Sequence, residues 1–386
     1  MVYQINNTEC KAILVEPPLL QTLLEAADKC GFPIDRIFLF SDKETGTVKN
    51  IKDWRSFLPS DSEAESWKWQ PMNSRESKDT VAALNYSSGT VSHKIEVIGR
   101  KLTHIDNQTG LPKGVMISHQ NVIANCEQSI YMRDLEQPYE SSSRPEERWL
   151  GFLPLYHAYG QLWSIVAAAR TLSPCYFMRS FNYAKFLENI QNHRITHIQT
   201  APPVLVMLAK RPETKKYDLS SLQNILCGAA PLSKELQNEV SAKCDLKVVQ
   251  TWGMTEVTCS CLHVPGGRDD RSGSVGFIDP NASIKLIDDE GKEVGPGERG
   301  EIHVKGPNVC MGYWRNERAT QETFDEEGYL KTGDVAVKDE NGWYWIVDRK
   351  KELIKVKGFQ VAPAELEALL LEHEHIADAA VCALQL

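Results

Sequence analysis

Short apolar runs alternate with segments of helical spacing through the middle of the chain. The strand-like runs are 150–155, 198–200, 224–227 and 247–250, and the helical segments between them include 185–192 and 203–210. Nearer the start, a helical pattern at 19–27 is followed by a strand-like run at 37–40. Strands that alternate with helices are typical of a sheet covered by helices. The pattern therefore predicts a fold of the α/β class with one large layered domain.

The spacing changes beyond Ser283. Apolar and polar side chains then alternate, as around Ile302 and Val304, and turn sequences such as 288–291 separate the runs. A β-rich subdomain is expected here. The charged stretch 348–351 precedes another strand, and Pro363 opens a helix.

These changes predict three parts of the chain. The N-terminal domain is expected over 1–347, a hinge at 348–351, and the start of a small, mobile α+β domain at 352–386. The polar stretch 42–77 reads as a surface connection with about one short helix.

Composition narrows the classes of partner. Apolar residues make up 42% and charged residues 25%, which is the usage of a globular protein, and the formal charge is -9 without a basic run. Nucleic acid is therefore not expected as a partner. The longest apolar stretch, 162–172, is shorter than a bilayer requires, so no membrane span is expected. No obligate protein partner is evident from the sequence.

Cysteines and chain ends bear on the compartment. The ten cysteines show no zinc-ligand spacing, which favours reduced, structural thiols. Residues 1–10 lack the pattern of a secretory signal, and 384–386 is not a peroxisomal tripeptide. A cytoplasmic or peroxisomal protein is the expectation.

The first chemical signal is split into two halves, 86–90 and 109–115. Joined, they read Tyr-Ser-Ser-Gly-Thr-Thr-Gly-Leu-Pro-Lys-Gly-Val, which resembles the phosphate-binding loop of the adenylate-forming acyl-CoA ligases. Hydroxyls, glycine amides and a lysine can surround a polyphosphate closely. The resemblance implies that ATP phosphates are held by Ser87, Ser88, Gly89, Thr90, Thr109, Gly110 and Lys113. The spacing is not that of a Walker A loop.

The segment between the halves, 91–108, is 18 residues long. Val91-Ser92 can be encoded as a splice donor, Gln108 can end as an acceptor, and 102–103 can encode a branch-point-like sequence. The hypothesis is a retained, in-frame, short intron of the kind found in filamentous fungi. The alternative is a genuine loop insertion, which would lie inside the phosphate cradle.

Three further segments follow in the order of that family: 153–160, 227–232 and 250–256. Taken singly, each reads as an ordinary loop or, for His157, a satisfied core histidine. Together they imply that His157 borders the acyl pocket near the reacting carboxylate, and that Thr255 and Glu256 bind the α-phosphate and Mg²⁺. The implied adenine-side residues are Gly228, Ala229, Ala230, Pro231, Trp252 and Gly253, and the implied pocket residues are Tyr159, Trp163 and Met254. The family usually has Tyr in place of Trp252, and either ring offers a flat face to a purine.

The last two segments are 329–334 and 348–360. Alone, the second reads as a solvated basic strand. By resemblance, Asp334 and Arg349 bind the ribose, and Lys351 is the pivot of the small domain. Lys357 and Gly358 then lie near the pantetheine tunnel, and Lys355 and Gln360 approach the adenylate, with Lys355 in a catalytic role.

The resemblance implies a two-step reaction with ATP, Mg²⁺ and coenzyme A. A small carboxylic acid is activated as the acyl-adenylate, pyrophosphate leaves, and the acyl group passes to the CoA thiol. Residues 358–367 resemble the 4-coumarate-CoA ligase kind, which favours CoA as the acyl acceptor. Residues 158–163 offer no aspartate for a substrate ammonium, which argues against an amino-acid adenylation role. Trp163 stands where aromatic-acid ligases have a small residue, which predicts a shortened or reshaped pocket.

Both ends of the family pattern are expected to lie outside this chain. An N-terminal lobe and the lysine that contacts the α-phosphate during adenylation have no counterpart in 1–386. A non-functional remnant, or an incorrect gene prediction, is therefore the alternative to an active ligase.

Overall fold

The computed structural model describes residues 1–87 and 112–350, together with 354–356, 359–361 and a few single positions after them. By its internal contacts the chain divides into two compact units, Met1–Glu76 and Ser77–Leu386. The predicted boundaries at 347 and 351 stay predictions. Each unit is described separately.

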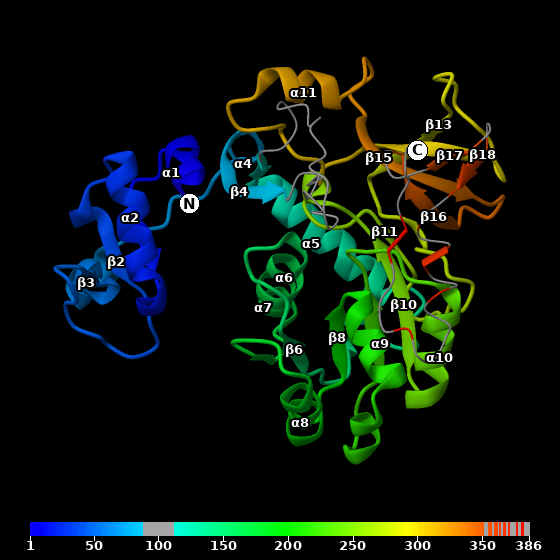
Figure 1. The fold of residues 1–386 in the computed structure, drawn as a ribbon, viewed down its shortest axis with the longest axis horizontal. Coiled ribbons are helices and arrows are strands. Elements are labelled where there is room, and N and C mark those ends of the chain that lie inside the picture. Colours follow the sequence, from blue (N-terminus) through cyan, green and yellow to red (C-terminus); the bar gives the residue numbers. More distant parts are fainter. Residues whose placement is uncertain are drawn as a thin grey trace, which may run out of the picture. The chain divides into compact units, whose positions relative to one another are not determined.

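The first unit is a small three-stranded parallel sheet with helices (Figure 1). Its elements are α1 (Val2–Thr8), β1 (Ile13–Val15), α2 (Leu20–Cys30), β2 (Ile37–Leu39), β3 (Lys52–Asp53) and α3 (Asp61–Ser66). Leu20, Leu23 and Ala27 on one face of α2 pack against Leu39 in the core. The predicted helix at 19–27 and strand at 37–40 are confirmed. Strand β3 lies in the stretch 42–77 that was expected to be a surface connection, and it was not predicted. Its two residues, both polar, are too few to show an alternation of apolar and polar positions.

The second unit contains a seven-stranded sheet in the order β12-β11-β10-β9-β8-β6-β7. The five strands β6 to β10 pair in parallel. At one edge β11 and β12 continue the sheet with antiparallel pairing. The bounds are β6 Trp149–Gly151, β7 Cys175–Phe177, β8 His197–Thr200, β9 Asn224–Cys227, β10 Lys247–Trp252, β11 Leu262–His263 and β12 Phe277–Ile278. The four predicted strands are all present, and β9 has the predicted bounds.

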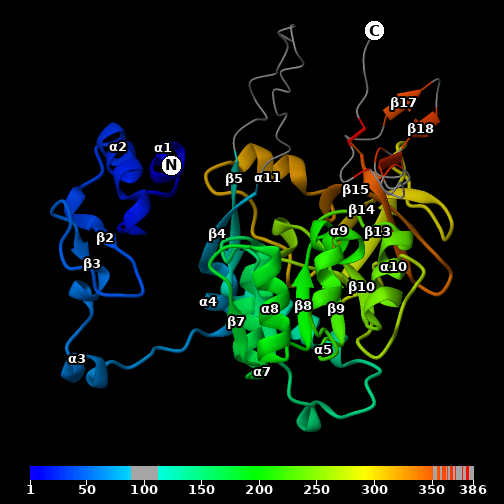
Figure 2. The same ribbon diagram turned by 60° about the horizontal axis from the view of Figure 1, so that its bottom comes forward.

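Helices cover both faces of this sheet. Ile198, Ile225 and Val248 face three helices, α8 (Tyr183–His193), α9 (Pro202–Lys210) and α10 (Lys234–Cys244). In Figure 2 these helices lie over the strands of the sheet. The next residues along two of the strands, Leu226 and Val249, belong to the opposite face. That face packs against α5 (His119–Asp134) and a π-helical turn, Gln161–Ala167, between α6 (Ala158–Gly160) and α7 (Ala168–Thr171). The layered α/β prediction is confirmed.

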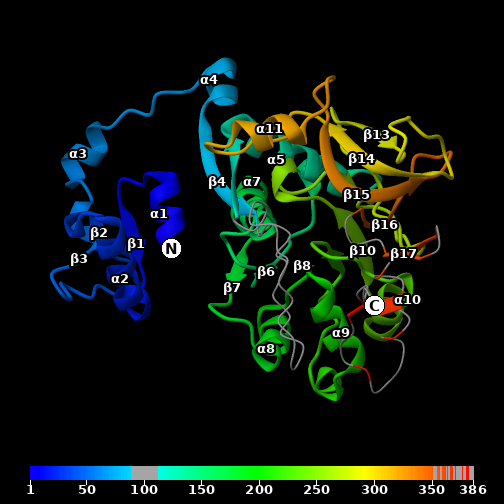
Figure 3. The same cartoon turned by 45° about the horizontal axis from the view of Figure 1, so that its top comes forward.

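A four-stranded antiparallel sheet forms the expected β-rich part (Figure 3). It consists of β13 (Ser283–Ile287), β14 (Arg299–Lys305), β15 (Leu330–Lys338) and β16 (Tyr344–Arg349), with α11 (Glu317–Thr323) before β15. A backbone bridge between Gly276 and Tyr344 joins it to the edge of the larger sheet. Asp348 and Arg349 of the predicted hinge are the last residues of β16 and pair with β15.

Two hairpins complete the second unit. α4 (Ser74–Asp79) leads into β4 (Val81–Ser87), which pairs with β5 (Lys113–Ser118), and β17 (Ile354–Val356) pairs with β18 (Phe359–Val361). Within the described ranges, no helix has the length and hydropathy to cross a bilayer. Nine cysteines lie in the described part of the chain, and each is a free thiol.

Candidate nucleotide site

The two halves of the split motif meet at the end of the β4–β5 hairpin. Ser87, the last residue of β4, is opposite Lys113, the first residue of β5, and Tyr86 is opposite Gly114. The Ser87 hydroxyl donates to the Lys113 carbonyl oxygen at 3.5 Å. Ser88, Gly89, Thr90, Thr109 and Gly110 lie outside the described residues. The pairing brings together two segments that the sequence separates by more than twenty residues.

Glu256 lies beside this hairpin, in the short 3-10 turn Thr255–Val257 that follows β10. Its side chain is only 6% exposed, and its Oε1 accepts a hydrogen bond of 2.8 Å from the Tyr313 hydroxyl. The ring of Tyr313 in turn lies under the Lys113 ammonium, whose Nζ is 4.8 Å from the ring centroid. Lys113 and Glu256, which the resemblance assigns to phosphate and Mg²⁺, therefore flank a single aromatic ring.

Sequence reasoning missed Tyr313. Its local sequence, Gly312-Tyr313-Trp314, reads as an aromatic turn, and only its pairing with β5 places it here. The Trp314 amide donates to the Gly114 carbonyl at 2.7 Å, and the Met116 amide donates to the Gly312 carbonyl at 2.9 Å.

The donor set around Glu256 suits Mg²⁺ carried by a nucleotide. In the described residues there is no cluster of three or more His, Cys, Asp or Glu side chains able to hold a metal by themselves. Mg²⁺ in phosphate-transfer sites is commonly bound by one or two carboxylates, with phosphate oxygens and water completing its shell. A single buried carboxylate next to a phosphate-binding hairpin fits that arrangement.

Trp252, the last residue of β10, contacts the carboxylate assigned to the ribose. The Trp252 indole N–H donates to Asp334 Oδ2 at 2.9 Å, and Arg349 Nε lies 3.6 Å from Asp334 Oδ1. The Thr332 hydroxyl accepts from the Asp334 amide at 3.1 Å. Asp334 thus contacts both Arg349, which the resemblance also assigns to the ribose, and Trp252, which it assigns to the adenine.

The loops after β9 and β10 lie side by side because those strands are parallel neighbours. After β9, Ala229 has a left-handed φ of 70°, and Ala229, Ala230 and Pro231 are exposed. After β10, a Cβ on Gly253 would lie 1.8 Å from the Cys259 carbonyl oxygen, so only glycine fits there. Exposed loop residues at the carboxyl ends of parallel strands are where open α/β sheets bind ligands.

His157 caps α6, which carries Tyr159 and leads into the π-helical turn that carries Trp163. Its Nδ1 accepts from the Tyr159 amide at 3.2 Å, which requires the proton of the neutral ring to reside on Nε2. Desolvation lowers the pKa of His157 below the usual histidine value, which favours that neutral form. His157 is an exposed residue near the carboxyl end of β6, so its Nε2–H could serve a ligand there.

Tyr159 and Trp163 are buried, at 5% and 2% exposure, while Met254 is half-buried. The Tyr159 hydroxyl donates to the Leu226 carbonyl at 2.7 Å. The two side chains thus fill space between the helix and the sheet. This packing agrees with a pocket shortened by Trp163 and leaves the pocket assignment a prediction.

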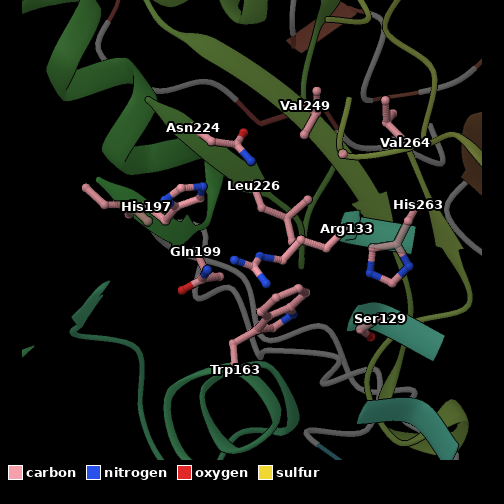
Figure 4. Close-up of a pocket in the computed structure, with 12 residues that line it drawn as sticks. Ser129, Arg133, Trp163, His197, Gln199, Asn224, Leu226, Val249, His263 and Val264 are labelled. Atoms are coloured by element: carbon pink, nitrogen blue, oxygen red, sulfur yellow. The ribbon is translucent and has the colours of Figure 1, made fainter. Parts of the chain in front are cut away.

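Behind Trp163 lies a cavity of about 30 Å³ (Figure 4). The Trp163 indole N–H and His263 Nε2, both on its wall, have no protein hydrogen-bond partner. The volume suffices for about two water molecules, which could satisfy both groups. Ligand pockets are roughly ten times larger, so this cavity is too small to be the acyl or nucleotide site.

The remaining predicted residues belong to the segment after β16. Lys355 and Gln360 are paired across the β17–β18 hairpin. Lys351, Lys357 and Gly358 lie outside the described residues. Their assigned roles stay predictions.

A family model described as AMP-binding enzyme matches residues 108–314, just over half of the chain. The chain belongs to the AMP-binding enzyme family. Among AMP-binding relatives, a probable 4-coumarate-CoA ligase 1 of Dictyostelium discoideum is 37% identical over 99% of this chain and 68% of its own length. The chain spans between 52% and 68% of the lengths of four such relatives.

Solved AMP-binding structures agree with this fold. ATP-bound MatB of Rhodopseudomonas palustris superimposes with a TM-score of 0.74 at 27% identity, over 95% of this chain and 64% of that one. The O-succinylbenzoate coenzyme A synthetase MenE of Bacillus subtilis, in complex with ATP and magnesium, has a TM-score of 0.71 at 25% identity, over 99% of this chain and 68% of that one.

Proposed function

We propose that this chain is the nucleotide-binding part of an ATP-dependent acyl-CoA ligase. The observation that carries the proposal is the contact of Lys113 and Glu256 with one ring, because it gathers a phosphate ligand and a metal ligand at the end of the β4–β5 hairpin. The contact between Trp252 and Asp334 adds a ribose ligand at the end of β10, the strand that the turn with Glu256 follows. ATP, Mg²⁺ and coenzyme A are the expected cofactors.

In this proposal the protein acts by positioning and by charge. Lys113 and the hairpin would hold the phosphates, Thr255 would donate to the α-phosphate, and Glu256 would hold Mg²⁺, whose charge offsets that of the triphosphate. The neutral His157 offers Nε2–H to the carboxylate that attacks the α-phosphorus. Pyrophosphate leaves. The CoA thiol then attacks the acyl carbon, the bond from that carbon to the phosphate oxygen breaks, and AMP and the thiol proton are released.

Arg349, the last residue of β16, and the residues that follow it would serve the change from adenylation to thioester formation. Arg349 binds the ribose together with Asp334, and rotation about Lys351 brings Lys357 and Gly358 to the pantetheine. Lys355 and Gln360 approach the adenylate. A single domain rotation can present both chemistries at one site.

The acid is proposed to be a small apolar or aromatic carboxylate. Tyr159, Trp163 and Met254 are the apolar residues that the resemblance places at the pocket, and relatives are named as 4-coumarate-CoA ligases and as a phenylacetyl-CoA ligase. Trp163 is the reason to expect a shortened or reshaped pocket, and its large, buried side chain supports that part of the proposal.

We further propose that 91–108 is a retained intron. The register of Ser87 with Lys113 closes a regular hairpin end, so removing 91–108 would leave only a short loop between the paired strands. The family match begins at residue 108, where this segment ends. Sequencing the full-length transcript tests the idea: absence of the 54 nucleotides supports it, and their presence in mature mRNA refutes it.

The function is tested by ATP–pyrophosphate exchange on the product of the full-length transcript, with aryl, medium-chain and amino acids in parallel. Exchange with an aryl or medium-chain acid, followed by CoA-dependent thioester formation, is the expected result. Exchange with amino acids alone would indicate an adenylation domain for peptide assembly. A folded protein without any exchange or MgATP binding would identify a non-functional remnant. The cytoplasmic or peroxisomal location stays a prediction.

A further inference from the structure

Tyr313 connects two groups that the proposed reaction uses separately. Its hydroxyl is bound to Glu256 Oε1 at 2.8 Å, and its ring supports the Lys113 ammonium at 4.8 Å. Tyr313 is 7% exposed and Glu256 6% exposed, so water competes little for the hydrogen bond. A phenylalanine would fill the same core, which means that the hydroxyl needs an explanation other than packing.

The direction of the hydrogen bond is fixed by chemistry. A tyrosine phenol keeps its proton at neutral pH, and the Tyr313 hydroxyl lies 2.8 Å from Glu256 Oε1, so it is the donor. An ionised carboxylate can only accept hydrogen bonds, and its two oxygens offer about four lone-pair positions. One donated bond therefore limits rotation of the carboxylate and still leaves capacity for a cation.

The backbone holds this arrangement from both sides. Val115 on β5 forms a bridge with Tyr313, which ties the segment to the phosphate hairpin. The Cys310 amide donates to the Glu256 carbonyl at 2.8 Å, which ties the same segment to the turn after β10. Movement of the hairpin relative to Glu256 would have to break one of these contacts.

We propose that Tyr313 is a positioning residue that fixes the Glu256 carboxylate and the Lys113 ammonium relative to each other, so that nucleotide and divalent cation bind as one unit. This inference rests on the proposed function. It assigns Tyr313 no contact with substrate: its effect passes through Glu256 and Lys113. The consequence is that loss of the hydroxyl should weaken the metal-dependent part of nucleotide binding more than the metal-independent part.

The test compares Tyr313→Phe with the intact chain by calorimetric titration with MgATP and with ATP in excess chelator. We expect MgATP affinity to fall about tenfold, the usual scale for one hydrogen bond to a charged group, and metal-free ATP affinity to change less than threefold. Tyr183→Phe is the matched control. Tyr183 is also buried, its hydroxyl pairs with Thr214 Oγ1 at 2.7 Å, and Arg211 Cζ lies 5.3 Å from its ring centroid.

Thermal unfolding without nucleotide checks that each variant folds. If Tyr313→Phe does not fold, 4-fluorophenylalanine at position 313 fills the hydroxyl's place without donating a proton. A double-mutant cycle adds a readout that a structural role would not move: in the Glu256→Gln background, Tyr313→Phe should no longer change the Mg²⁺ dependence.

The outcomes separate the two claims. An intact chain that binds MgATP, with Tyr313→Phe equal to it, overturns the positioning role and leaves the proposed function in place. Equal weakening of MgATP and metal-free ATP also overturns that role, because the hydroxyl would then support the site as a whole. A folded intact chain that binds no MgATP refutes the proposed function, and the inference with it.

Discussion

Replacing Trp252 with phenylalanine tests whether the indole N–H orients the carboxylate of Asp334. The bond runs from Trp252 Nε1 to Asp334 Oδ2 at 2.9 Å and joins residues 82 positions apart. Phenylalanine keeps an aromatic face for a purine and removes only this donor and part of the ring. Asp334 would keep the Arg349 guanidinium at 3.6 Å but lose its indole partner.

The magnitude follows from the kind of bond that is lost. A hydrogen bond to a charged group contributes about 1.5–3 kcal/mol. The Asp334 side chain is 16% exposed, so water can replace part of the loss and the lower end applies. About 1.5 kcal/mol corresponds to roughly a tenfold weaker binding of AMP.

The assay is equilibrium binding of AMP and of its 2′- and 3′-deoxy analogues to both proteins. The carboxylate is proposed to accept from the ribose hydroxyls, so the variant should lose affinity for AMP and lose less for the deoxy compounds. Trp345→Phe is the control, because it removes an indole N–H outside the proposed site. Trp345 lies on β16, and its indole N–H donates to the Ser272 carbonyl at 3.3 Å. Equal losses for all three nucleotides would show that Trp252 acts through its ring, and unchanged AMP binding would refute the reasoning.

Three further predictions concern a glycine and two histidines. Gly253→Ala should lower the melting temperature strongly, because its Cβ would meet the Cys259 carbonyl oxygen at 1.8 Å, whereas Gly295→Ala, whose nearest contact is 3.6 Å away, should not. Burial lowers the pKa of His197 to about 4, below its unfolded value, so the unfolded chain binds more protons between these values. Stability should fall by about 3 kcal/mol as the pH drops from 6.5 to 4, and His197→Asn should remove that part in urea unfolding series. The His157 ring should stay neutral at pH values below the ordinary histidine pKa, with its NMR titration midpoint shifted down; a midpoint at or above that value would contradict the desolvation argument.

The sequence by itself determined the elements whose burial is periodic. The run 224–227 became β9 without change, and the helical spacing at 203–210 became α9 with one residue added, Pro202. Side chains along these elements alternate between the core and the opposite face at the period of their backbone, so the pattern is local information. Motif resemblance supplied the candidate residues in chain order for the same reason: apart from the split phosphate loop, each motif is a short, continuous run of sequence.

Tertiary structure alone decided which of those loops meet. Lys113, Glu256 and Tyr313 come from three separate segments, and nothing in the sequence near Tyr313 indicates that its hydroxyl reaches a carboxylate 57 residues away. The contact of Trp252 with Asp334 depends in the same way on how the small antiparallel sheet joins the edge of the large one. Such contacts follow from the pairing of strands and the packing of layers, which no local period encodes.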